Sequence, residues 1–240
     1  MQLPSIQGKD EGFQRDQAYT GMRRLLILQQ VSEGERLREA EWAARLGVNR
    51  TALREAFARL AAEGTLEVRP RRGGYFVPKL TAEDVFEIME IRIMLEGGAI
   101  QRICSMGLNN PEHLSSMRKA CDDFEMLLRE GYLLGVAEAD RRFHESLVQA
   151  AGNKRLAMLY LRAPLPIVYP GMFSHEQWLA RAARDTLHEH ETLLKTILAG
   201  DVLEAQQLLR AHLTERFTRT LRNGFGDAGA GHDSEKPSMG

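Results

Sequence analysis

The sequence predicts a mainly α-helical protein of two parts, a small N-terminal part with one β-hairpin and an all-helical antiparallel bundle. Apolar residues recur at helical spacing in nearly every window of the chain. The convincing strand signal is confined to residues 66–77, where β-forming residues flank a basic turn that contains Pro and Gly. With 240 residues, the chain is long enough for each part to bury a core of its own.

Turn-forming residues and changes of composition divide the chain into five segments. Residues 1–14 are polar and aperiodic and residues 223–240 are rich in Gly and Ser, so both ends are expected to be disordered. Between them we expect one domain over residues 15–77, a linker over residues 78–81 and a second domain over residues 82–222. The second domain contains the predicted helices 82–105, 111–130, 134–150, 154–163, 175–199 and 201–222.

Charge and composition limit the class of protein. The net charge is −1, but residues 15–80 hold 13 Lys and Arg against 8 Asp and Glu, which is a weak indication of a nucleic-acid partner. No apolar run approaches the roughly 18 residues of a membrane helix, and the N-terminus lacks the pattern of a secretory signal. We therefore expect a cytoplasmic protein without a membrane partner, in which Cys104 and Cys121 are reduced thiols.

Residues 39–64 have the pattern of a helix-turn-helix. A short helix is followed by a turn at Gly47 and by a second helix that Asn49 can cap. Apolar residues of the second helix recur at i, i+3, i+4 and i+7 and should face the core; they are Leu53, Ala56, Phe57 and Leu60. The opposite side of the helix start is then free to enter a major groove.

Basic residues surround that helix start. Arg50 and Arg54 can each pair with guanine O6 and N7, and Thr51 can reach a phosphate or a thymine methyl group. Taken alone, two arginines would indicate an ordinary solvated helix face. Together with the turn glycine and the basic hairpin after it, they indicate a reader of double-stranded DNA. Because one recognition helix buries little surface, we expect a homodimer on a palindromic operator.

The segment GVNRTALREAFARLAAEGTLEVRPRRGGYFV resembles the winged helix-turn-helix of the GntR superfamily of bacterial repressors, a likeness that covers residues 17–77. Asn49 replaces the usual Ser and Ala52 the usual Pro, and Ala40 stands where some members have a DNA-contacting Arg. The expected DNA-binding residues, from the pattern and the resemblance together, are Arg38, Asn49, Arg50, Thr51, Arg54, Arg72 and Gly73.

Four residues of the helical part have the spacing of a metal site. Asp140 and His144 lie one turn apart on one helix face. His190 lies ten residues before Gly200 and His212 twelve after it, so a helical hairpin that turns at Gly200 brings the two imidazoles to the same height. One carboxylate and three imidazoles suit zinc or another borderline divalent ion such as nickel, with open positions for an effector oxygen.

The helical part resembles the FCD effector domain of the FadR-like branch of the same superfamily. The likeness covers residues 82–222 and is carried by residues 84–100, 137–153 and 188–213. It implies a transcription regulator, expected to be a repressor, whose helical domain binds a small molecule at the metal site.

Arg92 lies on an otherwise apolar helix face between Met89 and Leu95, where an unpaired guanidinium is costly. Its partner is either a helix carboxylate or the carboxylate of an effector. The resemblance to regulators of organic-acid catabolism favours Arg92 as an effector-binding residue.

Two other function classes fit the sequence less well. A metal-dependent hydrolase could use the same four ligands, but the chain has no HExxH, no Gly-rich phosphate loop and no G-x-S-x-G. An architectural DNA binder without a ligand would not need the four-residue cluster. We therefore expect a regulator and not an enzyme.

Overall fold

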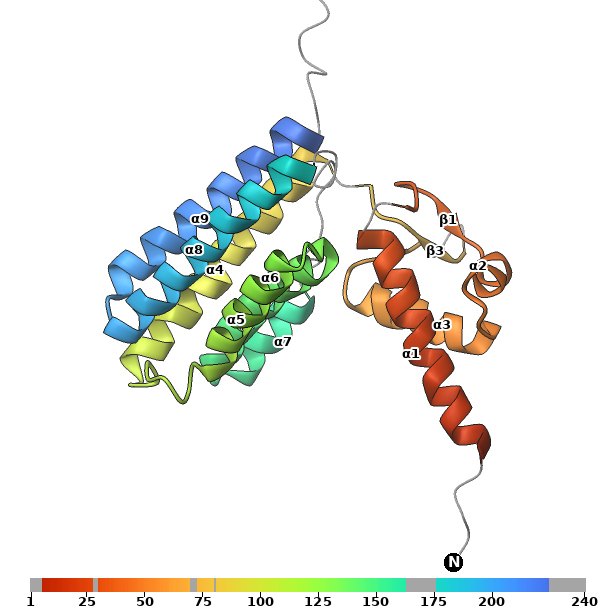
Figure 1. Cartoon of the computed structure of the whole chain (residues 1–240), viewed down its shortest axis with the longest axis horizontal. Coiled ribbons are helices and arrows are strands. Elements are labelled where there is room, and N and C mark those ends of the chain that lie inside the picture. The colour runs from red at the N-terminus through yellow and green to blue at the C-terminus, as the bar shows by residue number, and fades with distance from the viewer. Residues whose placement is uncertain (1–5, 28–29, 70–72, 80, 163–175, 225–240) are drawn as a thin grey trace, which may run out of the picture.

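The computed structural model describes residues 6–27, 30–69, 73–79, 81–162 and 176–224, and the structural statements below concern those residues. Figure 1 shows a small N-terminal part next to a larger part made of long helices. The small part combines helices with a three-stranded antiparallel sheet. This arrangement confirms the predicted fold class, a winged helix-turn-helix followed by a helical domain.

The N-terminal part has a three-stranded sheet where the sequence predicted a two-stranded hairpin. Its elements are α1 (Ile6–Ile27), β1 (Arg36–Leu37), α2 (Glu39–Leu46), α3 (Arg50–Ala62), β2 (Glu67–Val68) and β3 (Tyr75–Phe76). Strands β2 and β3 form the predicted hairpin, and β1 pairs with the other edge of β3. Strand β1 escaped prediction because its partner β3 lies far along the chain, so no hairpin turn marks it in the sequence.

The predicted apolar face of α3 forms the centre of the N-terminal core. Leu53, Phe57 and Leu60 are fully buried, together with Met22 of α1 and Trp42 of α2. Truncating an aromatic side chain in such a core costs about 3–5 kcal/mol. The packing therefore fixes which side of α3 faces outward.

Helix α1 begins earlier than the sequence suggested. Residues 6–14 were expected to be disordered, but the helix starts at Ile6. Gln14, at the end of this stretch, contacts α3: its Oε1 accepts hydrogen bonds from the backbone N–H and the side-chain Nδ2 of Asn49, at 3.0 and 2.7 Å. The turn of α1 that contains Gln14 is thereby tied to the start of α3.

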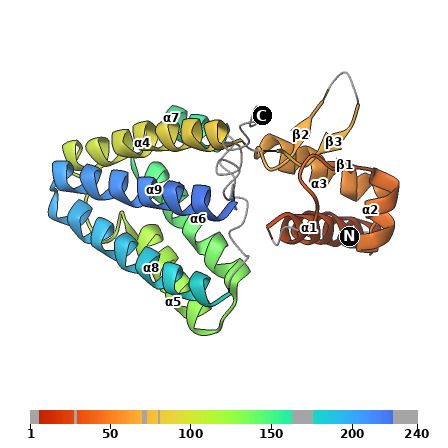
Figure 2. The ribbon, with the colours of Figure 1, turned by 90° about the horizontal axis from the view of Figure 1, so that it is seen from above.

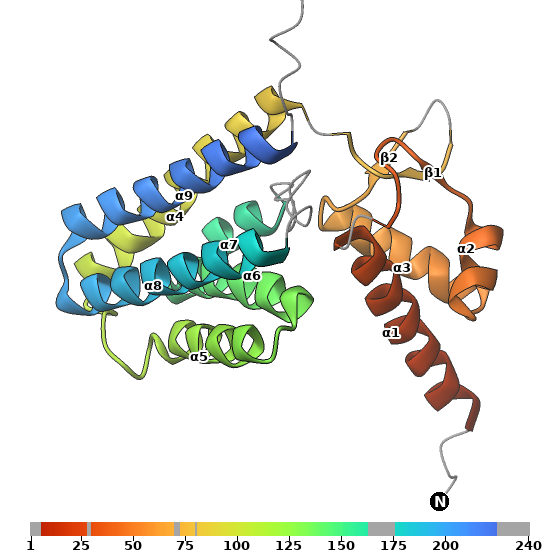
Figure 3. The ribbon, with the colours of Figure 1, turned by 45° about the horizontal axis from the view of Figure 1, so that its top comes forward.

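Long helices form the second part as an antiparallel bundle. They are α4 (Ala82–Ser105), α5 (Ser115–Arg129), α6 (Leu133–Ala150), α7 (Lys154–Arg162), α8 (Glu176–Ala199) and α9 (Val202–Gly224). Helices α4, α8 and α9 lie side by side, with α5, α6 and α7 beside them (Figures 1 and 3). The predicted helices match these bounds closely, except that α5 starts four residues later than expected, after a turn in which the N–H of His113 donates to Asn110 Oδ1 at 3.0 Å.

The α8–α9 hairpin decides where the predicted metal ligands lie. Gly200 joins the two helices with φ +79°, a left-handed conformation that favours glycine. Asp201 precedes α9 and caps its start, its Oδ1 accepting the backbone N–H of Glu204 at 3.1 Å. This tight turn sets α8 and α9 antiparallel, as Figure 2 shows.

Charged and polar side chains are buried in the middle of the bundle. The apolar core includes Ile100, Phe143 and Leu193, all essentially inaccessible to solvent. The same interior holds the polar side chains Arg92, Glu96, Asp140, His144, Thr186, His190 and His212. Burying so many polar groups is costly unless each is satisfied, so this region is a candidate site. Within the described ranges no helix has the length and apolar character required to cross a membrane.

Candidate DNA-binding surface and metal centre

The start of α3 is held by Asn49. Its side-chain Oδ1 accepts the backbone N–H of Ala52 at 2.8 Å, the geometry of a helix N-cap. The cap position predicted from sequence is therefore present. With the two bonds to Gln14, it commits the Asn49 side chain to holding the helix start in place.

Three predicted DNA-contacting residues lie exposed at this helix start. Arg50, Thr51 and Arg54 all point away from the buried face of α3. The Arg50 side chain is 71% exposed, and one of its terminal nitrogens lies 4.0 Å from Glu39 Oε2. Such exposed guanidinium groups retain their capacity for bidentate pairing with a base edge.

The other predicted contacts surround α2 and the sheet. Arg38 is exposed at the N-cap of α2, and Gly73 is exposed next to β3 with φ +61°. Arg72 lies outside the described residues. Arg69 is held by the sheet itself, because it pairs with Glu67 at 2.8 Å and covers the ring of Phe76.

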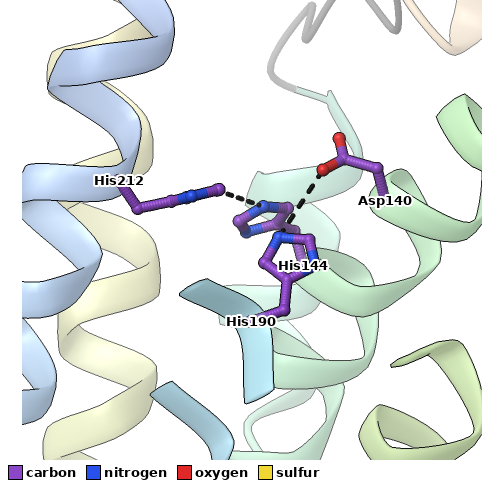
Figure 4. Close-up of side chains that lie close together, drawn as sticks. All are labelled: Asp140, His144, His190 and His212. Atoms are coloured by element: carbon purple, nitrogen blue, oxygen red, sulfur yellow. Dashed lines mark hydrogen bonds and ion pairs between the residues drawn. The ribbon is translucent and has the colours of Figure 1, made fainter. Parts of the chain in front are cut away.

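The four predicted metal ligands come together. Asp140 and His144 project from α6, His190 from α8 and His212 from α9 (Figure 4). One ligand atom from each residue lies within 4.8 Å of the others, and all four residues are buried. The cluster predicted from the sequence is therefore present in the structure.

The ligand-atom separations fit a small divalent ion. His144 Nε2 lies 3.2 Å from His212 Nε2, and His190 Nε2 lies 3.5 Å from Asp140 Oδ1. Two ligands of a tetrahedral zinc ion are about 3.4 Å apart, because each bond is about 2.0–2.1 Å. These two separations are close to that value, so the cluster could hold a metal ion.

Aromatic packing holds His190 in place. Its ring stacks on that of Phe143 at 4.0 Å between centroids, with 8° between the planes. Phe124 meets the same ring edge-on at 5.9 Å. The ring orientation is thus restricted on more than one side, which preorganises the ligand.

Two glutamates contact the other two imidazoles. Glu96 Oε2 lies 2.6 Å from His144 Nδ1, and Glu189 Oε2 lies 2.6 Å from His212 Nδ1. Glu96 is fully buried and also accepts a hydrogen bond from Tyr160 Oη at 3.0 Å. Both carboxylates sit on the Nδ1 side of their ring, leaving Nε2 turned toward the cluster.

Arg92 forms the ion pair that the sequence left as one alternative. Its Nε donates to Glu96 Oε1 at 2.8 Å, one helical turn along α4, and its side chain is 9% exposed. It also lies close to the cluster: burial and then the positive charge of Arg92 lower the pKa of His144 well below its ordinary value. The neutral imidazole that results is the form that binds metal.

Comparison with known proteins identifies both parts of the chain. Residues 14–76 match the bacterial regulatory proteins of the gntR family, and residues 87–215 match the FCD domain. The chain belongs to the gntR family. Both resemblances predicted from the sequence are thereby confirmed.

Relatives of this gntR-family chain are transcription regulators. The Nta operon transcriptional regulator of Aminobacter aminovorans is 30% identical over 78% of this chain and 85% of its own length. A protein of Paenarthrobacter nicotinovorans named as a D-xylose utilization operon transcriptional repressor is 30% identical over 80% of this chain and 82% of its own length. Since families and relatives are regulators and not enzymes, the prediction against an enzyme is confirmed.

Solved structures share the fold. A GntR regulator of Rhodococcus sp. RHA1 has a TM-score of 0.62 at 25% identity, covering 86% of this chain and 97% of its own. McbR/YncC of E. coli has a TM-score of 0.66 at 20% identity, covering 87% and 97%, and shows the fold alone.

Sequence reasoning missed two carboxylates of this gntR-family protein. Glu189 precedes Gly200 by eleven residues and His212 follows it by twelve, so the hairpin register that paired the histidines could also have found Glu189. Glu96 lies one turn after Arg92 on α4, and the need of Arg92 for a partner was the available signal. Its contact with His144 joins residues 48 positions apart and has no local signature.

Proposed function

We propose that this regulator is a homodimeric repressor whose affinity for a palindromic operator is controlled by a small carboxylate effector bound at a divalent metal site. The observation that carries the proposal is the buried cluster of Asp140, His144, His190 and His212. It lies in a chain whose other domain exposes the arginines of a recognition helix.

The recognition helix supports DNA binding. Arg50, Thr51 and Arg54 are outward-facing at the start of α3, and the wing follows with two glycines of positive φ, Gly73 and Gly74. In this proposal Arg38, Asn49, Arg72 and Gly73 contribute to the backbone contacts or hold the reading residues in position. The named repressors among the relatives support repression as the outcome.

The metal site supports effector binding. Three imidazoles and one carboxylate would hold zinc or nickel, and a bound ion would supply open positions that accept a carboxylate or hydroxyl oxygen. Arg92 lies beside the cluster, where its guanidinium complements a carboxylate effector. Its Nε contact with Glu96 fixes the orientation of the guanidinium plane.

A contact between α1 and α6 supports communication between the metal cluster and the recognition helix. Arg23 of α1 places a terminal nitrogen 2.9 Å from Glu138 Oε1 of α6, the helix that also carries Asp140 and His144. The other terminal nitrogen of Arg23 lies 3.2 Å from the hydroxyl of Tyr19, which donates to Glu63 at the end of α3. A shift of α6 on effector binding would therefore reach the scaffold of the recognition helix.

A homodimer follows from the demands of operator recognition. One recognition helix covers a short half-site, and two-fold symmetry matches a palindrome. A regulator of bacterial operators acts where the chromosome is, which is the cytoplasm. Sedimentation of the full chain at micromolar concentration should give a dimer with and without DNA; a monomer under both conditions would contradict the proposed assembly.

Metal content tests the site itself. Native mass spectrometry and elemental analysis of the full chain should find one divalent ion per chain after exposure to zinc. Replacing His212 by Ala removes one ligand and should reduce that content to a small fraction, whereas the control His188→Ala, which changes an exposed side chain of the same α8–α9 hairpin, should not. Equal metal content in the parent and His212→Ala would overturn the site.

A further inference from the structure

Two carboxylates outside the four-ligand cluster contact the Nδ1 atoms of two of its imidazoles, on the side of each ring away from the cluster. Glu96 of α4 contacts Nδ1 of His144, and Glu189 of α8 contacts Nδ1 of His212, each at 2.6 Å. Both contacts are short, as expected of hydrogen bonds to an ionised carboxylate. Each glutamate comes from a different helix than the histidine it contacts.

The chemistry of these contacts fixes the position of the protons. An ionised carboxylate can only accept a hydrogen bond, so the Nδ1 of His144 and the Nδ1 of His212 each carry a proton. A neutral imidazole has one N–H, which leaves Nε2 as the acceptor nitrogen. In both rings Nε2 is the atom directed at the cluster, and the two Nε2 atoms are 3.2 Å apart.

Two acceptor nitrogens at that separation repel each other unless a cation or a proton lies between them. A hydrogen bond between them would need a proton on one Nε2 in addition to the proton on each Nδ1. A divalent ion bound by both lone pairs removes the repulsion without that proton. The two carboxylates therefore prepare the rings for a metal before it arrives.

We infer that Glu96 and Glu189 are positioning residues that hold His144 and His212 in the Nδ1–H tautomer and so set the affinity of the site for a divalent metal. The inference rests on the proposed metal function and adds residues that do not touch the metal. Carboxylates that accept the far N–H of ligating histidines typically raise metal affinity 10- to 100-fold.

Replacing Glu96 would disturb more of the surrounding structure than replacing Glu189. Glu96 is fully buried and also bonds Arg92 and Tyr160, so its replacement disturbs a buried ion pair. The Glu189 side chain is 26% exposed, so its replacement should disturb the core less than that of Glu96. Glu191 is exposed on the same helix and provides a matched control.

The test is a zinc titration of the full-length chain, stripped of metal, against a chromophoric chelator. Glu189→Ala removes the acceptor and should weaken zinc binding 10- to 100-fold, and Glu189→Gln, which keeps a neutral acceptor, should give a smaller loss. Glu191→Ala should bind zinc within twofold of the parent. Long-range ¹H–¹⁵N NMR of the imidazoles supplies the second readout. In the metal-free parent both rings should carry the Nδ1 proton, and in Glu189→Ala the His212 proton should move to Nε2.

The outcomes separate the inference from the function on which it rests. If the parent binds zinc and Glu189→Ala matches it in affinity and tautomer, the inference is overturned and the metal site stands. If neither zinc nor nickel binds the parent, the proposed metal function is overturned and the inference falls with it. A lower melting temperature of Glu189→Ala with unchanged zinc affinity would assign the residue a structural role only and would also overturn the inference.

Discussion

At the scale of single residues, the arginines at the start of α3 and the buried Arg92 of the bundle differ in their exposure to solvent. Arg50 is 71% exposed, whereas the guanidinium of Arg92 is buried against Glu96. An exposed guanidinium is free to meet a base edge, and a buried one must be paired in the folded chain. Exposed arginines such as Arg50 are therefore suited to contact DNA, whereas the buried Arg92 contributes to the arrangement of the side chains around the metal cluster.

The reading role of α3 gives the first prediction. Replacing Arg50 or Arg54 by Ala should each cost about 1–3 kcal/mol of binding to the specific site, because a bidentate contact to guanine is lost. Fluorescence anisotropy with a duplex selected by the parent from a random pool measures this. The control Arg129→Ala alters an arginine of α5 that is 72% exposed and should leave affinity unchanged. Parent-like binding by the double variant Arg50→Ala, Arg54→Ala would show that α3 does not read the operator.

A second prediction concerns a buried thiol. Burial raises the pKa of Cys121 to about 12, so at pH 8 only roughly one thiol in ten thousand is the reactive thiolate. Iodoacetamide should label Cys121 far more slowly in the native chain than in urea. Because pH 8 lies below this pKa, raising the pH to 9 should increase the native rate about tenfold. Equal native and unfolded labelling rates, followed by mass spectrometry, would contradict this burial.

At the scale of elements, the α8–α9 hairpin is the part of the fold on which the site depends. Its turn brings His190 and His212 to within 4.9 Å between ring centroids, although they come from different helices. Gly200 makes that turn with φ +79°, and a Cβ there would lie 3.2 Å from Asn109 Nδ2. Asn109 donates to the carbonyl of Leu198 at 3.3 Å, so it cannot move away without loss.

Gly200→Ala should therefore lower stability by about 1–2 kcal/mol, the cost of a left-handed residue with a Cβ. It should also weaken zinc binding, because the two imidazoles lose their register. Gly98→Ala is the control: Gly98 lies in α4 with open space around its Cβ position, and alanine in a helix interior gains about 0.5–1 kcal/mol. Urea denaturation measures both variants. A Gly200→Ala chain as stable as the parent would show that the turn tolerates other residues.

Features that depend on neighbouring residues could be predicted from the sequence, and features that depend on distant contacts could not. Helix bounds such as Ala82–Ser105 follow from apolar periodicity and from flanking turn residues, which are local signals. The spacing within each pair of ligands is also a local signal, i, i+4 for Asp140 and His144 and hairpin symmetry for His190 and His212, whereas the resemblance to the FCD domain supported joining the two pairs in one site. Strand β1 and the contact of Glu96 with His144 were not predicted, because each depends on a partner that is distant in the sequence and close only in the folded chain.

At the scale of the whole molecule, the ion pair between Arg23 and Glu138 connects the helical bundle to the DNA-reading part. Arg23 and Glu138 are 11% and 23% exposed in their side chains, less than the surface ion pairs of this chain such as Arg129 with Glu125. Partial burial increases the electrostatic contribution of such a pair. Tyr19 continues the contact toward α3, with Arg59 over its ring at 3.7 Å.

We expect Arg23→Ala to preserve operator binding without effector and to reduce the change in affinity that an effector causes. The neighbouring Arg24→Ala, an exposed residue of the same helix, should respond as the parent does. Arg23→Lys, which keeps a positive charge opposite Glu138, should retain part of the response. Full effector response in Arg23→Ala would show that communication takes another route.

The most direct test of the account is operator affinity, measured by anisotropy on the zinc-loaded full chain against a panel of small mono-, di- and tricarboxylates. We predict that at least one carboxylate changes the affinity of the parent by 5-fold or more, the usual lower end of allosteric coupling. His212→Ala should bind the operator as the effector-free parent does and should respond to no member of the panel. A His212→Ala chain that responds as the parent does, or a zinc-loaded parent whose affinity no carboxylate alters, would contradict control of DNA binding through the metal site.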